Sequence, residues 1–406
     1  MCVRSQAEEV QASLNRLRPG DNSYASEFVE QLLQAAREVH ASDLHLQPTP
    51  QGLEVRWRLD GVLQSVGTFP RGHSTDVVSR LKVLAELLTY RNDVPQEGRI
   101  RERQGEVEIR VSTFPTLHGE RAVVRLFAAA GHLLYPDDLG LPGEILHGLR
   151  KLLVETSGAI LVSGPAGSGK TTTAYACLRE LVRRSGNARS LVSLEDPIEV
   201  AVDGVAQSQV HATAGFDLAT GLRSLMRQDP EAIFVGEIRD RPTAEAVFQA
   251  ALTGHLVITT FHAGSAAGAI SRLADMGIEP YLLRSGILGI VSQRLARRLC
   301  DCARDVTEEE SKLGLPVQHA RQTVGCPACF KTGYQGRFVL AELLLAQPTE
   351  LGRAILSRSD APQLEQLAVQ TGMVTLWRRA CQAAEQGLTS PEEVRRVLGF
   401  VDDRGS

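Results

Sequence analysis

The chain has 406 residues, of which 43% are hydrophobic and 23% are charged, so it has enough apolar material for two or three domains and does not read as a disordered tail. Its formal net charge of −4 provides no overall basic field, and direct nucleic-acid binding is therefore not expected. No run approaches the roughly 18 consecutive apolar residues of a membrane helix, and the first residues lack a signal-peptide core. We expect a cytoplasmic protein without a transmembrane segment.

The first part of the chain predicts a small α+β domain. A polar leader, residues 1–22, ends in a Pro-Gly-Asp-Asn turn signal, and residues 24–39 then carry apolar side chains at helical spacing. The runs LEVRWRL and EVEIRVS alternate as strands do. We place this domain at residues 23–127 and assign the Ala-, Gly- and Pro-rich residues 128–142 to a linker.

The next part of the chain predicts an α/β core. Four apolar runs of strand length, AILVS, SLVSL, AIFVG and LVITT, alternate with helical stretches, as in a mostly parallel sheet with helices on both faces. We place this core at residues 143–299. Beyond Glu279 the pattern is helical except for a cysteine-bearing insert at residues 300–337. Residues 338–406 are therefore expected to form a helical C-terminal subdomain, with a helix start at Ser390.

A glycine-rich motif lies between the first strand of this core and the helical run that follows it. The segment GPAGSGKT fits the pattern G-x-x-x-x-G-K-[ST], and the strand-loop-helix setting argues against a chance match. In such loops the backbone N–H groups surround phosphates, the lysine reaches the β and γ phosphates, and the last hydroxyl ligates Mg²⁺. The motif predicts a triphosphate nucleotide, held by Gly164, Pro165, Ala166, Gly167, Ser168, Gly169, Lys170, Thr171 and Thr172.

Acidic and polar residues follow the other three strands. Glu195 and Asp196 end SLVSLEDP, Glu237 ends AIFVGE, and His262 comes just after LVITTF. These positions share the sheet edge where ligands bind, so a carboxylate there can hold Mg²⁺ or polarise water. Gly236 stands where an Asp usually precedes the Glu of this motif. Taken singly, each acid could equally be a loop charge or helix cap, and the histidine could be structural.

Four ordered segments together carry a family resemblance. GPAGSGKTTT, SLEDPIE, GLRSLMRQDPEAIFVGEIRD and AALTGHLVITTFHAG resemble the Walker A, Asp, Walker B and His boxes of the secretion and pilus-assembly traffic ATPases. The resemblance covers roughly residues 23–400 and implies a small N-terminal α+β domain followed by a RecA-like P-loop ATPase domain. It also implies a homo-oligomeric ring, expected to be a hexamer, that hydrolyses ATP with Mg²⁺ to drive an inner-membrane assembly platform. The protein would then associate peripherally with the inner membrane through its partners.

The resemblance also implies roles for individual residues. Glu195 would activate the attacking water, Glu237 would organise Mg²⁺ directly or through water, and His262 would sense the γ-phosphate. Arginine-finger function is implied for Arg110, Arg125, Arg223 and Arg227. For Arg121 and Arg239 a surface salt bridge is an equal alternative, so both are left out of this set.

Four of the seven cysteines cluster late in the sequence. Cys300, Cys302, Cys326 and Cys329 resemble the zinc-binding insert of the secretion and pilus-extension members of the family. Such a zinc ion would be structural, and the thiols would be reduced. The first pair is C-x-C, one residue tighter than the C-x-x-C of the family, so a metal-free cluster of buried or oxidisable thiols is the alternative.

Two other functions compete with the motor. One is an ATP-binding regulatory or scaffold subunit that does not hydrolyse ATP, and the other is a conjugation-type DNA-transport ATPase. Lys170, Thr171, Glu195 and Glu237 argue against an inactive site, and the sequence pI near 6.2 together with the cysteine insert favours the secretion and pilus branch. With about 22 residues before the first family domain, we expect docking through a surface other than a long N-terminal module.

Overall fold

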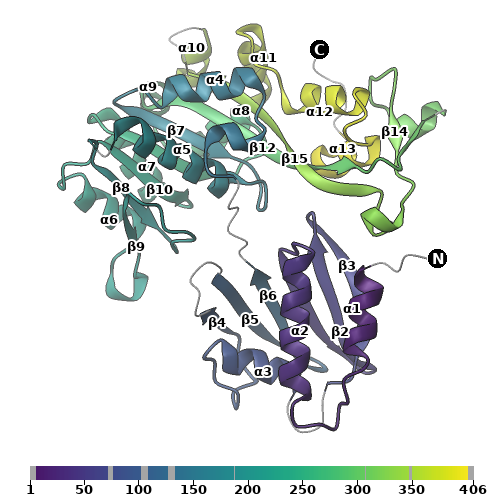
Figure 1. Ribbon diagram of the computed structural model, residues 1–406. Coiled ribbons are helices and arrows are strands. Elements are labelled where there is room, and N and C mark those ends of the chain that lie inside the picture. Colours follow the sequence, from purple (N-terminus) through teal and green to yellow (C-terminus); the bar gives the residue numbers. More distant parts are fainter. Residues whose placement is uncertain are drawn as a thin grey trace. The chain divides into compact units, whose positions relative to one another are not determined.

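The computed structural model describes residues 6–71, 76–101, 108–126, 133–186, 188–306, 308–346 and 350–400 (Figure 1). Its contacts divide the chain into two compact units. The first unit contains residues up to Gly131 together with Leu299–Ala303 and Thr323–Gly336, and the second contains His132–Arg298, Arg304–Gln322 and the remainder from Arg337. Part of the proposed linker, residues 128–132, lies outside the described residues. No helix among the described residues is long and apolar enough to cross a membrane.

Among its described residues, the first unit contains a six-stranded antiparallel sheet in the order β3-β2-β1-β6-β5-β4. Its elements are α1 (Gln6–Leu14), α2 (Tyr24–Glu38), β1 (Asp43–Thr49), β2 (Gly52–Leu59), β3 (Val62–Phe69), α3 (Val77–Leu84), β4 (Gln96–Arg101), β5 (Glu108–Thr116) and β6 (Gly119–Leu126). Alternate residues of a strand face opposite sides of the sheet. On β2, Val55 and Trp57 are buried with Phe28 of α2, while Arg56 and Arg58 lie on the other face.

The second unit is built on a mostly parallel sheet, seven-stranded within the described residues, in the order β15-β12-β7-β11-β10-β8-β9. Strands β12, β7, β11, β10, β8 and β9 pair in parallel along this order. Ala159 and Leu161 of β7 pack into one hydrophobic cluster, while Ile160 packs into another. Helices therefore cover both faces of the sheet, as the sequence predicts.

The elements of this unit follow in chain order. They are α4 (Gly143–Leu152), β7 (Gly158–Ser163), α5 (Lys170–Ser185), β8 (Leu191–Glu195), β9 (Ala206–Gln209), α6 (Leu218–Leu225), β10 (Ala232–Ile238), α7 (Arg241–Leu252), β11 (Leu256–Phe261), α8 (Ala266–Asp275), α9 (Pro280–Gly286), β12 (Ile287–Leu299), β13 (Arg304–Asp305), β14 (Arg321–Gln322), β15 (Tyr334–Leu345), α10 (Glu350–Leu356), α11 (Ala361–Gln370), α12 (Leu376–Glu385) and α13 (Pro391–Leu398). Helix α13 begins as expected, since the Ser390 hydroxyl accepts a hydrogen bond from the Glu393 N–H.

The expectation of helical structure beyond Glu279 is wrong for two long segments. β12 and β15 are strands, and β12 extends the sheet by pairing with β7. Residues 289–293 of β12 are buried on both faces, so this run shows no alternation of apolar and polar side chains. A short apolar run of this kind cannot be distinguished from a buried helix by its period.

Candidate active site

The glycine-rich loop joins β7 to α5, as its sequence predicts. Gly164, Gly167 and Gly169 all have positive φ angles, of 152°, 74° and 86°. At Gly164 a β-carbon would lie 2.5 Å from the Gln293 carbonyl oxygen of β12, so that position must also be free of a side chain. The loop leads directly into α5, whose first residue is Lys170. The backbone therefore has the form of a phosphate cradle at a helix N-terminus.

Lys170, Glu237 and His262 come together beside this loop. The ring nitrogen Nε2 of His262 lies 2.8 Å from Oε1 of Glu237, and the Lys170 ammonium donates a 2.9 Å hydrogen bond to the Pro165 carbonyl. Burial lowers the pKa of Lys170, although the nearby Glu237 charge opposes that shift. Burial, and then the Lys170 charge, lower the pKa of His262, so its imidazole is neutral at pH 7.

Arg239 joins this group through two ion pairs, so the surface salt bridge considered from sequence is present, but its partners include Glu237 of the site. It donates from Nε to Glu237 at 2.9 Å and from Nη1 to Asp196 at 3.0 Å. It thereby links Asp196, just after β8, with Glu237 near the end of β10. The hydrogen bonds to Glu237 raise the pKa of Arg239. A signal was available, because Arg239 lies two residues after Glu237 and alternate residues share a face of an extended segment.

Glu195 lies on the adjacent strand but is enclosed. Its side chain is 3% exposed and accepts hydrogen bonds from the hydroxyls of Ser193 and Tyr175, at 2.6 and 2.5 Å, and from the Gln207 amide at 3.0 Å. These donors fix the orientation of both carboxylate oxygens. The sequence shows the acid at the strand end and Ser193 two residues before it, but not the contacts from Tyr175 and Gln207, because these residues come from other elements.

Arg223 and Arg227 lie on α6 and just after it, and both are exposed. The described contacts include a hydrogen bond from Arg227 to the Arg223 carbonyl. Within the described part of the chain, the contacts of Lys170, Glu237 and His262 include neither of these guanidinium groups. Their assignment as arginine fingers stays a prediction.

Arg110 and Arg125 lie in a row of charged residues across the sheet of the first unit. The strand registers place Arg58, Asp43, Arg125, Arg110 and Arg99 side by side on β2, β1, β6, β5 and β4. Asp43 pairs with Arg125 at 3.0 Å and with Arg58 at 3.4 Å. One carboxylate thus stands among four arginines in the row, which makes this face of the sheet attractive to anions.

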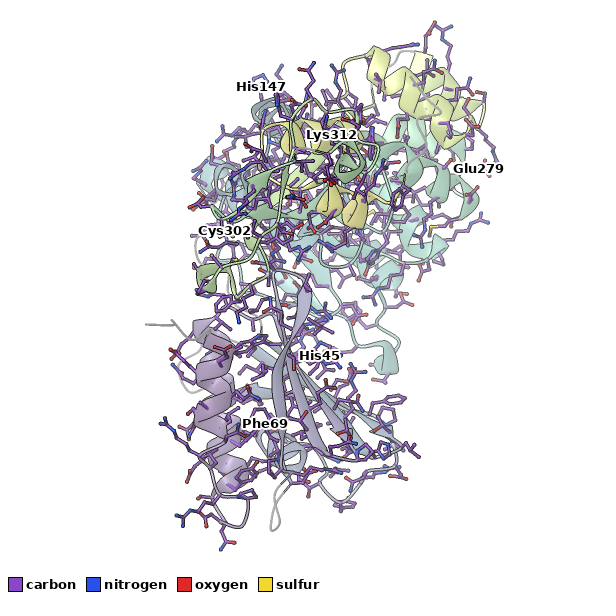
Figure 2. All side chains as sticks on the ribbon, turned by 90° about the vertical axis from the view of Figure 1, so that its right-hand side faces the viewer. His45, Phe69, His147, Glu279, Cys302 and Lys312 are labelled. Carbon is purple, nitrogen blue, oxygen red and sulfur yellow. The ribbon has the colours of Figure 1, made fainter. Side chains whose placement is uncertain are left out.

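The same positive charges act on His45, which lies two residues beyond Asp43 on the same face of β1. Burial, and then the charges of Arg58 and Arg121, lower the pKa of His45. Figure 2 labels this histidine on the sheet of the first unit. Arg121, for which a surface salt bridge is an alternative from sequence, lies 3.0 Å from the His45 ring nitrogen Nδ1. Strand register, which sequence alone does not supply, brings these residues together.

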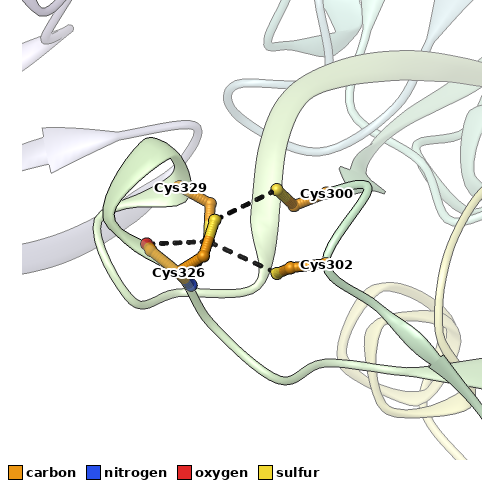
Figure 3. Close-up of side chains that lie close together, drawn as sticks. All are labelled: Cys300, Cys302, Cys326 and Cys329. Atoms are coloured by element: carbon orange, nitrogen blue, oxygen red, sulfur yellow. Dashed lines mark hydrogen bonds between the residues drawn. The ribbon is translucent and has the colours of Figure 1, made fainter.

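The four clustered cysteines converge within the first unit (Figure 3). Their sulfur atoms all lie within 4.8 Å of one another, with 3.8 Å between Cys300 and Cys326 and 3.9 Å between Cys302 and Cys329. A zinc ion bound tetrahedrally at ~2.3 Å from each thiolate separates its sulfurs by about 3.8 Å. The tighter C-x-C pair therefore still reaches the geometry of a four-thiolate metal site.

Backbone amides favour the thiolate form of one of these cysteines. Burial acts to raise the pKa of Cys329, but the N–H groups of Cys326 and Gly333 donate to its sulfur at 3.1 and 3.2 Å, and the pKa falls to about 7. Since metal ligands must be deprotonated, Cys329 offers a thiolate to a cation, whereas the raised pKa values of Cys300 and Cys302 require that a cation displace their protons.

Comparison with known proteins places the whole chain in one family. The model of the family Type II/IV secretion system protein matches residues 20–396. The Type II secretion system ATPase E of Vibrio cholerae is 40% identical over 97% of this chain and 79% of its own length. The Type IV pilus assembly ATPase PilB of Thermus thermophilus is 39% identical over 97% of this chain, which spans 44% of that protein.

Solved structures agree with the fold. The pilus retraction motor PilT with bound ADP matches 93% of this chain and 97% of its own, at 25% identity and a TM-score of 0.63. The ATPase DotB of Legionella pneumophila matches 91% of this chain and 94% of its own, with a TM-score of 0.66 at 21% identity. The chain therefore belongs to the Type II/IV secretion system protein family, as a traffic ATPase of the secretion and pilus-assembly kind.

Proposed function

We propose that this chain is the ATP-hydrolysing ring motor of a type II secretion or type IV pilus assembly system. The observation that carries the proposal is the convergence of the loop residue Lys170 with Glu237 and His262 at one edge of the parallel sheet. We further propose that it works in the cytoplasm as a homo-oligomer, expected to be a hexamer, held at the inner membrane by an assembly-platform protein. The names of the relatives support this assignment.

The phosphates of ATP would lie in the loop formed by residues 164–169, with Lys170 beside the β and γ phosphates. The hydroxyl of Thr171 and the carboxylate of Glu237 form an oxygen-only donor set, which suits Mg²⁺. Bound there, the ion would neutralise charge that develops on the transferred phosphoryl group. Glu195, held by Tyr175, Ser193 and Gln207, would orient the attacking water. The neutral His262 would contact the γ-phosphate without adding charge.

The arginines would complete the site in the assembled ring. Arg110 and Arg125 would approach the phosphates when the first domain closes, and Arg223 and Arg227 would act from α6. An arginine finger can contribute about 10³ to 10⁵ in rate, so its position would determine when hydrolysis occurs. The positive row that contains Arg110 and Arg125 supports this role, because a polyphosphate would relieve its like-charge repulsion.

Cys300, Cys302, Cys326 and Cys329 would hold one structural zinc ion. The separations of their sulfur atoms support this assignment over a metal-free thiol cluster. The free energy of binding would stabilise segments that contain little other core.

The deciding experiment measures ATP turnover by the purified chain as a function of its concentration, beside Glu237→Gln and Arg110→Ala. A rate that rises steeply as rings assemble and collapses in both variants supports a ring motor gated by its first domain. Nucleotide binding without turnover, even in assembled protein, would instead identify a scaffold subunit. A pull-down of an assembly-platform protein, against a DNA-binding control, separates the secretion and pilus branch from a conjugation-type ATPase.

A further inference from the structure

The side chain of Gln293 joins β12 to the phosphate-binding loop at two points. Gln293 is 1% exposed, and its amide nitrogen donates a 2.7 Å hydrogen bond to the Ser168 carbonyl. Its amide oxygen accepts a 2.9 Å hydrogen bond from the Thr173 hydroxyl. The orientation of the amide is chemically determined, because a carbonyl can only accept whereas a hydroxyl can also donate.

The bond to Ser168 fixes one peptide plane of the loop. In a trans peptide the C=O and the following N–H point in opposite directions, so holding the Ser168 carbonyl toward β12 points the Gly169 N–H away from it. Gly169 has a φ of 86° and no side chain, and glycine can adopt either orientation of the preceding peptide at little cost. Without Gln293, this peptide could rotate and present a carbonyl where a phosphate requires a donor.

We propose that Gln293 is a positioning residue for nucleotide binding, which holds the Ser168–Gly169 peptide with its N–H directed into the phosphate cradle. The inference rests on the proposed function, since it assigns to this chain's loop the task of binding ATP. Gln293 acts through the loop backbone and through Thr173 at the start of α5, without itself touching the nucleotide.

Binding of mant-ADP with Mg²⁺ to the full chain tests this role. Gln293→Leu removes both hydrogen bonds. Because the bond to Ser168 is the one that orients the loop, the Kd should rise about five- to tenfold, which corresponds to one buried hydrogen bond. The KM for ATP should rise in parallel, and kcat should change less. Thr389→Val is the matched control. Its hydroxyl is also fully buried and donates a 2.8 Å hydrogen bond to β12, at the Arg297 carbonyl, and its loss should leave the Kd within twofold.

Gln293→Glu separates positioning from packing, because it keeps the size of the side chain. An ionised glutamate can accept from Thr173 but cannot donate to Ser168, whereas a protonated one can do both. Relative to the native chain at the same pH, binding by Gln293→Glu should be weak at pH 8.5 and recover toward pH 5.5. A merely structural role would instead make the free energy of unfolding of the variant follow the same pH dependence, so the Kd is compared at pH values where urea unfolding shows the variant fully folded.

Several results would overturn the inference: a Kd for Gln293→Leu within twofold of native, an equal loss in Thr389→Val, or no recovery of Gln293→Glu at low pH. These failures differ from failure of the proposed function. If the native chain binds no mant-ADP, both the proposed function and the positioning role of Gln293 are refuted. If it binds and hydrolyses ATP while the Gln293 variants behave like native, only the positioning role is refuted.

Discussion

Replacing Glu393 with glutamine should lower the free energy of unfolding of the second unit by about 3 kcal/mol. Glu393 of α13 is fully buried and accepts hydrogen bonds from the backbone N–H, Nε and Nη2 of Arg297 on β12, at 2.9, 2.9 and 2.7 Å. The Arg297 side chain is 14% exposed, so removing its carboxylate partner leaves a largely desolvated charge. Breaking one side of such a pair costs about 3–5 kcal/mol.

Two details of the site place the expected loss at the lower end of that range. Arg396 also pairs with Glu393 but is 44% exposed, so water can replace its partner and its share is about 1 kcal/mol or less. The glutamine oxygen can still accept some of the same hydrogen bonds. The substitution therefore removes mainly the compensation of the Arg297 charge.

The pH dependence follows from the direction of the pKa shift. Burial alone would raise the pKa of Glu393, but the hydrogen bonds from Arg396 and Arg297 outweigh it and lower the pKa below 4.5. A carboxyl group whose pKa is lower in the folded state contributes stability above its unfolded pKa and loses it as the pH falls through the folded value. The difference in free energy of unfolding between the native protein and Glu393→Gln should reach its full value at pH 7 and become smaller below pH 4.5.

Urea unfolding followed by the fluorescence of Trp377 measures this gap, with both proteins in a Trp57→Phe background. Trp377 of α12 is a suitable probe because its ring lies 4.9 Å from the guanidinium of Arg395, which shares helix α13 with Glu393. The exposed neighbour Glu392→Gln is the control and should change stability by less than about 0.5 kcal/mol. A gap below about 1 kcal/mol at pH 7, or one that persists unchanged at pH 4, would refute the reasoning.

Three further predictions concern the functional groups. Arg239→Gln should lower kcat roughly tenfold or more, because Glu237 loses an orienting partner. It should leave the free energy of unfolding almost unchanged, since Arg239 is 56% exposed. A kcat equal to that of the native chain in steady-state assays would contradict this prediction. The lowered pKa of His262 places its protonation below the ordinary histidine range, so turnover by the native chain should decline only at more acidic pH, where protonated His262 would form an ion pair with the Glu237 carboxylate. His262→Asn should lack this decline in a pH-rate profile. Cys302→Ser should reduce zinc measured by elemental analysis from about one ion per chain, whereas Cys177→Ser, buried outside the cluster, should retain it; equal zinc in both would exclude the four-thiolate site.

The sequence predicted those parts of the site that depend on local order. The glycine-rich loop and His262 each follow a strand directly, and Glu237 lies near the end of β10. Parallel strands bring their carboxyl ends to one edge of the sheet. The structure accordingly joins Glu237 to His262 and places both near Lys170. The roles assigned to them remain predictions that the proposed assays test.

Parts that depend on strand register could not be predicted in the same way. The row from Arg58 to Arg99 requires five strands to be aligned, and a slip of one residue would turn each side chain to the other face. Of the three donors that enclose Glu195, Ser193 lies two residues away on β8, but Tyr175 and Gln207 come from α5 and β9, elements whose contacts with β8 are not local in sequence.

β12 shows how one misread element hides several contacts. Its apolar run is interpreted from sequence as helical. In a helix Gln293 and Arg297 would lie side by side on one face, because residues four apart are neighbours there. In the strand these residues lie on the same face but well separated, because each residue advances about 3.3 Å. Gln293 can then reach the phosphate-binding loop while Arg297 pairs with Glu393 of α13. The same strand thus anchors both the nucleotide loop and the C-terminal helices, and so the Glu393 and Gln293 substitutions should have separable effects, one on stability and the other on nucleotide affinity.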